Sequence, residues 1–246
     1  MTDTATVQPT APAPMGLAAR FLGVLTSPRS TFAAVAAAPR WIGMAVLVIL
    51  VTMGPQLWFQ STDVGRQATL DESVRRVESF GVKVSDQMYE GMRKSIMEPS
   101  MARTAMSAGA MAVFPPIIWA VMAGLLFLVF GVFTGGNATF KQLYAVVVHS
   151  GVISAVGAAL ITPLNYARES LTSATNLGVF LPFLPEGSFL ARLAGMIDLF
   201  LIWWLVVLAI GVAVTYKKKT GGVAAVLFGI YAVIAIGFAA FMAGRS

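Results

Sequence analysis

The stretch that decides the fold is residues 198–216, which read DLFLIWWLVVLAIGVAVTY and are followed by three consecutive lysines. After its first residue the stretch holds no charged side chain, and as a helix it approaches the roughly 30 Å thickness of the hydrocarbon core of a bilayer. Four other stretches share this character. The sequence therefore predicts five membrane-spanning helices, at about residues 41–60, 108–133, 142–163, 193–216 and 222–242.

The composition excludes several classes of protein. Hydrophobic residues make up 57% of the 246 residues and charged residues only 11%, against roughly 25% charged in a soluble domain. The net charge of +6 does not indicate nucleic-acid binding, because the basic residues flank apolar stretches and form no basic face with interleaved aromatics. With no Cys and a single His, we expect no metal, no cofactor and no disulfide.

Outside the spans the chain divides into three parts. Residues 1–14 are rich in Ala, Thr and Pro, a composition typical of a disordered tail, and residues 15–246 are expected to form one membrane domain. Its first part, Met15 to Ala38, predicts an interfacial helical segment with a helix start at Ser27 and Pro28. Residues 61–103 carry seven basic and seven acidic residues and predict a helical hairpin outside the bilayer. The expected fold class is an all-α polytopic membrane bundle.

The positions of Lys and Arg predict the orientation, because short cytoplasmic loops retain positive charge. With the N-terminus inside, the inner segments carry Arg20, Arg29, Arg40, Lys141 and Lys217 to Lys219. The short outer segments carry Arg168, Arg192 and Arg245. We therefore expect a cytoplasmic N-terminus and a C-terminus on the outer side.

Three blocks, in this order along the chain, resemble the prokaryotic branch of the Yip (Ypt-interacting protein) family. They are FLGVLTSPRSTF at residues 21–32, GGNATFKQL at residues 135–143 and IDLFLIWW at residues 197–204. The resemblance covers roughly residues 15–243 and implies the cytoplasmic (inner) membrane of a prokaryote, a cytosolic N-terminus and no established reaction.

Eukaryotic members of the family that this chain resembles are associated with Rab-type GTPases and vesicle traffic. Their longer acidic and aromatic N-terminal region has no counterpart in residues 1–14. GTPase binding is therefore doubtful for this chain.

Asp198 and His149 are the candidate functional polar residues of the spans, because an ionisable group in hydrocarbon is costly unless it pairs, protonates or reaches water. Asp198, about 9 Å below the start of the predicted fourth span, could be a titrating group or could cap a helix that follows an interfacial segment. His149 is expected near mid-bilayer. It could be a neutral side chain bonded to a neighbouring helix, or part of a proton relay that reaches Asp198 through a water-filled cavity.

Two further sets of residues are candidates for contacts. Gly131 and Gly135 have the spacing that allows two helices to pack closely. Lys217, Lys218 and Lys219 could contact anionic lipid, or could serve only as an orientation anchor.

These residues support two functional hypotheses. The first is a non-enzymatic multipass protein that organises membrane or partner proteins, including copies of itself. The second is a carrier or channel for protons, ions or lipid that uses Asp198 in a polar intramembrane cavity. We predict no catalytic residues, because a hydrolase would need an oriented nucleophile and base, and Ser150 next to His149 points about 100° away on a helix.

Overall fold

The structure, a computed structural model, describes residues 15–132, 135–185 and 187–244. Within these residues the secondary structure is helical, with no strand beyond one isolated bridge between Asn176 and Asp198. The predicted all-α class is therefore confirmed, and the predicted tail, residues 1–14, lies outside the described residues.

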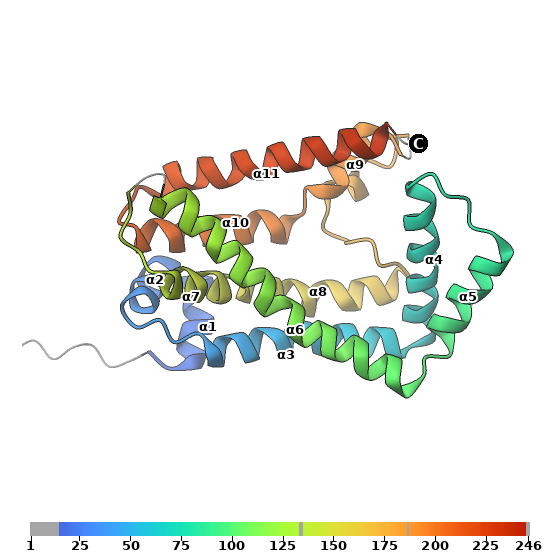
Figure 1. Cartoon of the computed structure of the whole chain (residues 1–246), viewed down its shortest axis with the longest axis horizontal. Coiled ribbons are helices and arrows are strands. Elements are labelled where there is room, and N and C mark those ends of the chain that lie inside the picture. Colours follow the sequence, from blue (N-terminus) through green and yellow to red (C-terminus); the bar gives the residue numbers. More distant parts are fainter. Residues whose placement is uncertain (1–14, 133–134, 186, 245–246) are drawn as a thin grey trace, which may run out of the picture.

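The helices follow one another as α1 (Leu17–Thr26), α2 (Pro28–Ala37), α3 (Ile42–Ser61), α4 (Asp63–Ser79), α5 (Asp86–Met97), α6 (Met101–Leu126), the π-helical turn η1 (Phe127–Val132), α7 (Phe140–Ser150), α8 (Val152–Ala167), the 3-10 turn η2 (Leu177–Phe180), α9 (Phe189–Met196), α10 (Leu199–Thr215) and α11 (Thr220–Ala243). The long helices lie roughly along one axis, and α6 crosses them diagonally (Figure 1).

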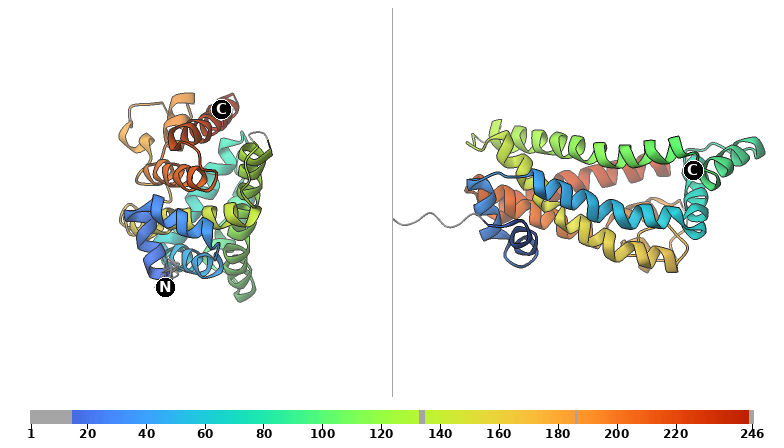
Figure 2. Two further views of the ribbon diagram at one scale, coloured as in Figure 1. Left: turned by 90° about the vertical axis from the view of Figure 1, so that its left-hand side faces the viewer. Right: turned by 90° about the horizontal axis from the view of Figure 1, so that it is seen from below.

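Four helical stretches are long and apolar enough to cross a membrane: α3, α6 with η1, α7 with α8, and α11. The fifth predicted crossing contains α10, a shorter apolar helix whose 17 residues extend about 25 Å. The stretch formed by α7 and α8 lies at the centre, because 67% of its most apolar window is buried, against 17–22% for the other three. Lipid therefore faces mainly α3, α6 and α11, which lie on three different sides of the bundle in the end-on view (Figure 2).

The fourth predicted span needs a correction. Residues 193–216 do not form one helix, since α9 ends at Met196 and α10 begins at Leu199. Asp198 therefore caps the fourth span and does not lie inside it. The prediction failed because the apolar composition continues through the break, and hydropathy alone does not register a change of backbone direction.

The helix that contains the second predicted span begins before that span. It begins at Met101 and not near residue 108, because Ser100 caps it by accepting a hydrogen bond from the Arg103 N–H at 3.3 Å. Pro115 and Pro116 lie inside α6, and Pro55 lies inside α3 without ending it. The other predicted span limits agree with the structure to within a few residues.

The core is densest where α2, α7 and α10 meet. Phe32, Leu143 and Leu208 are fully buried there. Gly211 of α10 permits this approach, since a Cβ atom at that position would lie 2.6 Å from Val146 Cγ1. The second helix of the predicted interfacial segment is thus part of the core, with Pro28 as its first residue.

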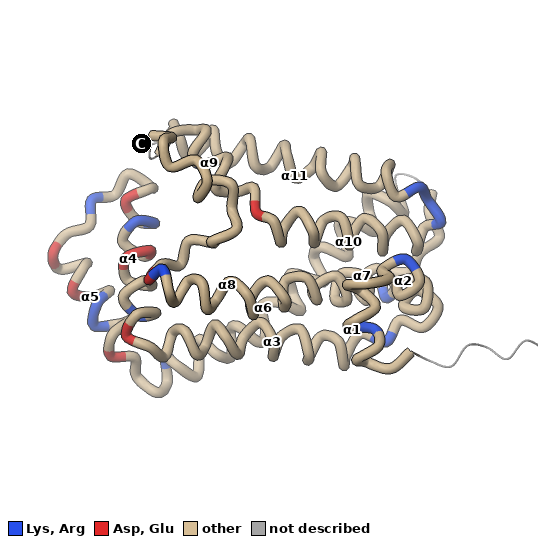
Figure 3. The backbone as a smooth tube through the Cα atoms, turned by 180° about the vertical axis from the view of Figure 1, so that it is seen from behind, with Lys and Arg blue, Asp and Glu red and all other residues tan. Residues whose placement is uncertain are grey.

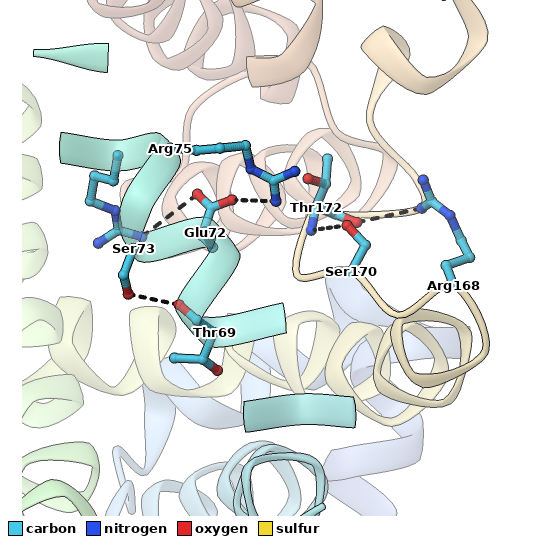
Figure 4. Close-up of polar contacts among 8 residues, drawn as sticks. Thr69, Glu72, Ser73, Arg75, Arg168, Ser170 and Thr172 are labelled. Carbon is cyan, nitrogen blue, oxygen red and sulfur yellow. Dashed lines mark hydrogen bonds and ion pairs between the residues drawn. The ribbon is translucent and has the colours of Figure 1, made fainter. Parts of the chain in front are cut away.

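The segment between the first two spans forms the predicted helical hairpin. Thr62 and Ser85 cap α4 and α5 through their hydroxyl groups, and α5 has no buried residue. The hairpin has four ion pairs, such as that of Arg75 with Glu72 at 3.0 Å, and each joins residues three or four apart in the sequence. In Figure 4 the contacts on α4 and those of the loop that follows α8 each stay within their own segment. The exposed ion pairs of the hairpin therefore add little to the stability of the fold.

Charge is distributed unequally between the two ends of the bundle. In Figure 3 the end with α1, α2 and the α10–α11 turn shows only Lys and Arg, whereas α4 and α5 at the other end carry both signs. Arg20 donates to the Arg40 carbonyl at 2.7 Å, and Arg29 donates to Thr220 Oγ1 at 3.0 Å. The Lys and Arg residues that are predicted to lie on the inner side of the membrane are therefore found at one end of the bundle.

Candidate functional site

Asp198 is the N-cap of α10 and accepts four hydrogen bonds. Its Oδ1 accepts from the backbone N–H groups of Phe200 and Leu201 at 2.9 and 3.3 Å. Its Oδ2 accepts from the hydroxyls of Ser173 and Thr175 at 2.7 and 2.6 Å. An ionised carboxylate only accepts hydrogen bonds, and these four donors match that capacity. The carboxylate is therefore used in a local network that begins a helix.

The backbone around Asp198 strengthens the same connection. Leu177 N–H donates to the Ile197 carbonyl at 2.8 Å, and Leu199 N–H donates to the Thr175 carbonyl at 3.2 Å. The Tyr231 hydroxyl of α11 donates to the Met196 carbonyl, which the helix break leaves without an intrahelical partner. The backbone groups at the break between α9 and α10 are thus hydrogen-bonded to the preceding loop and to α11.

His149 is fully buried in α7. Its Nδ1 lies 2.7 Å from the carbonyl oxygen of Ala145, one turn earlier on the same helix. The prediction that His149 forms a hydrogen bond with a neighbouring helix is therefore wrong for its Nδ1 atom. Nε2 has no hydrogen-bond partner within the described protein. The valines that precede His149 in α7, Val146, Val147 and Val148, are also buried.

The two candidate glycines have different roles. Gly131 is buried in η1, where a Cβ atom would lie 3.1 Å from the Tyr216 hydroxyl, so it packs inside the bundle. Gly135 lies beyond the end of η1, with φ of +67°, and a Cβ atom there would have nothing within 4 Å. They do not share one helix face, because the helix ends before Gly135. Gly135 instead supplies the left-handed backbone of a turn.

The three lysines form the turn between α10 and α11. Lys217 has a φ of +52°, and its N–H donates to the Val214 carbonyl at 3.2 Å. Lys218 N–H donates to the Ala213 carbonyl at 2.8 Å. These two bonds form a Schellman motif, which ends α10. All three side chains are exposed or partly exposed and remain free to meet lipid headgroups.

A groove of about 700 Å³ between α3, α6 and α8 was not predicted. Most of its wall is apolar, but five neutral polar side chains from α3 and α8 also line it: Thr52, Gln56, Ser154, Thr162 and Asn165. Thr52 Oγ1 and Asn165 Oδ1 are buried and have no hydrogen-bond partner in the described protein. A smaller cavity of about 220 Å³ lies beside it against α10 and shares Ser154 and Trp204 with it.

The sequence prediction missed this groove because its polar residues carry no charge and come from two helices far apart in the chain. The only signal in the sequence is the placement of amides, Gln56 and Asn165, within or at the end of apolar stretches. Neither Asp198 nor His149 lines the groove or the smaller cavity. Within the described residues no three His, Asp or Glu side chains come together as metal ligands would.

Comparison with known proteins identifies the family. A sequence model of the Yip1 domain matches residues 22–242, which is most of the chain and includes all five predicted crossings. The chain belongs to the Yip1 domain family. The matched range contains Asp198, the groove and the hairpin of α4 and α5.

A bacterial relative supports the assignment of this Yip1-family protein to a membrane. This chain is similar to the membrane protein YknW of Bacillus subtilis (strain 168), with 26% identity over 220 residues that cover 87% of each chain. No solved structure matches this chain. The predicted resemblance to the Yip family and the membrane location are therefore confirmed.

Proposed function

We propose that this Yip1-family protein is a non-enzymatic multipass membrane protein that organises partner proteins in the cytoplasmic membrane of a prokaryote. One observation carries the proposal: the ionisable groups of the spans are used in local structure. Asp198 receives four hydrogen bonds at a helix start, and His149 bonds the preceding turn of its own helix. Neither lines the 700 Å³ groove or the smaller cavity beside it.

The carrier hypothesis has weaker support. A carrier needs a polar site that is reached in turn from both sides of the membrane, commonly with an ionisable residue. The polar side chains of the 700 Å³ groove are neutral, and its wall is mostly apolar. Such a groove favours contact with lipid over binding of an ion.

We propose that the N-terminus is cytoplasmic and the C-terminus lies outside, with the hairpin of α4 and α5 on the outer side. The basic end of the bundle then faces the cytoplasm, as the retention of positive charge in short inner loops requires. In this orientation an organising protein offers partners two separate surfaces. One is the basic inner end, and the other is α5, in which no residue is buried.

Lysine-directed cross-linking in the native membrane tests the organising role. Lys83 and Lys94 report on the hairpin, while Lys141 and the lysines of the α10–α11 turn report on the opposite end. We expect reproducible cross-links from one of these two groups to the same few membrane proteins or to a second copy. The matched controls are Lys83→Arg and Lys94→Arg, which keep the charge and remove the reactive amine. A pattern with only internal cross-links at both ends would contradict the organising role.

A further inference from the structure

A second cavity of about 320 Å³ lies beyond the 700 Å³ groove, at the hairpin end of the bundle. On α3, residues up to Gln56 line the groove, and residues from Leu57 to Ser61 line the second cavity. Along α6 the groove is lined back to Ala110, and the second cavity follows from Ser107 to Arg103. These residues recur at intervals of three or four, so the two cavities lie along the same helix faces.

The second cavity is basic, although it lies at the end of the bundle that carries both charges. Arg66 from α4 and Arg103 from α6 both line it, and no acidic residue does. Five residues with hydroxyl groups also line it: Ser61, Thr69, Ser95, Thr104 and Ser107. Two arginines that line one cavity form the kind of site that binds a phosphate group.

Each arginine keeps donors for a ligand. Arg66 donates to the Ser61 carbonyl at 3.0 Å, and its Nε is buried without a partner in the described protein. Its ion pair with Asp63, at 3.7 Å, is weak because the Asp63 side chain is fully exposed to solvent. Arg103 donates to the carbonyl and the hydroxyl of Ser95 through a single nitrogen, Nη1.

The combined site extends over at least the depth of one lipid leaflet. From Arg103 to Met122 the axis of α6 advances about 28 Å, and half of a bilayer with its headgroups measures about 20–22 Å, so the combined site is long enough for a lipid of one leaflet. The deeper wall is apolar, with Val48, Trp119 and Met122. The uncharged polar residues Thr52 and Gln56 lie between this apolar end and the arginines.

We propose that the groove and the basic cavity form a single site for an anionic glycerophospholipid. Its acyl chain lies in the groove, its ester and glycerol oxygens lie near Thr52 and Gln56, and its phosphate lies between Arg66 and Arg103. A free phosphate would leave the groove unused, and a zwitterionic lipid would bring a cationic ammonium group, together with its phosphate, close to the two arginines. The site is independent of the organising role and distinct from the lysines of the α10–α11 turn.

Tryptophan quenching tests this site, because Trp119 lines the groove and Trp58 does not. A variant that keeps Trp119 alone, with the other four tryptophans changed to Phe, is reconstituted in phosphatidylcholine with increasing dibrominated phosphatidylglycerol. We expect saturable quenching at a few mole per cent of the brominated lipid, with a preference of roughly 30-fold over dibrominated phosphatidylcholine. A variant that keeps only Trp58 serves as the control and should show no saturable component.

Charge variants then locate the headgroup. In the Trp119 background, Arg66→Gln with Arg103→Gln should reduce the preference for phosphatidylglycerol to about one, that is, to none. Arg75→Gln with Arg76→Gln removes the same charge from the exposed face of α4 and should leave the preference unchanged. Native mass spectrometry of the wild type and of both double variants, in an equal mixture of the two lipids, measures the same preference without tryptophan changes.

Four results would overturn the proposal. The first is quenching of Trp119 that rises linearly with bulk mole fraction and equals that of Trp58. The second is an equal loss of preference in both double-arginine variants, which would indicate general surface attraction. The third is wild-type protein that, in native mass spectrometry, carries both lipids in proportion to their supply. Inorganic phosphate that competes fully with phosphatidylglycerol would also contradict it, because the acyl chain would then add no affinity.

Discussion

Replacement of Asp198 by Ala is expected to lower the free energy of unfolding by roughly 3 kcal/mol, because it removes an N-cap and two further charged hydrogen bonds. Ser173 and Thr175 would lose their acceptor, and the N–H groups of Phe200 and Leu201 would lose theirs at the start of α10. The loop that follows α8 would no longer be bonded to the fourth span through this side chain. Reversible unfolding in mixed micelles, followed by circular dichroism, measures the change.

Asp198→Asn is the matched control for this prediction. The amide oxygen still accepts from the backbone of α10, and the hydroxyls of Ser173 and Thr175 can rotate to accept from the new amide. We therefore expect a loss of about 1 kcal/mol. Equal losses for Ala and Asn would show that the charge, and not the hydrogen-bonded cap, stabilises this region, and would contradict the account.

Replacement of Gly211 by Leu is the second change with a large expected effect. Even a Cβ atom there would lie 2.6 Å from Val146 Cγ1 and 3.0 Å from Phe32 Cδ1. A larger side chain must therefore separate α10 from α7 and α2, and we expect a loss of roughly 3 kcal/mol or failure to fold. Gly211→Ala should cost less, about 1 kcal/mol, because one methyl group needs a smaller shift.

Gly229→Leu in α11 is the control for steric effects. A Cβ atom at Gly229 would have nothing within 4 Å, so the new side chain enters space that lipid fills. We expect no loss of stability, and a small gain from the better helix propensity of Leu. The same unfolding assay measures both positions. A Gly211→Leu protein as stable as Gly229→Leu would show that α2, α7 and α10 do not pack as closely as described.

The membrane crossings could be predicted from the sequence because a bilayer imposes a simple rule on length and polarity. The predicted first span, residues 41–60, differs from α3 by one residue at each end. The break at residues 197–198 could not be located in the same way. The hydroxyl donors that satisfy Asp198 come from positions 23 and 25 residues earlier, in a loop that has no regular pattern.

Only some of the candidate functional residues could be identified from the sequence. Asp198 was selected because it is ionisable, but the choice between a titrating group and a cap needs the contacts of the folded chain. The groove and its basic extension were missed for a different reason. Arg66 and Arg103 belong, in sequence, to a segment in which basic and acidic residues are equal in number, and only folding places these two beside each other without an acid in the cavity wall.

The most direct test of the central claim, that Asp198 serves structure and not transport, is a flux measurement in proteoliposomes. Wild type and Asp198→Asn are reconstituted at equal density, after both are shown to insert equally. A pH-sensitive dye inside the vesicles reports proton entry under an imposed potassium diffusion potential. We predict that both proteins give the same flux as protein-free vesicles. A wild-type proton flux above that background, abolished by Asp198→Asn, would contradict the account and establish Asp198 as the titrating group of a carrier.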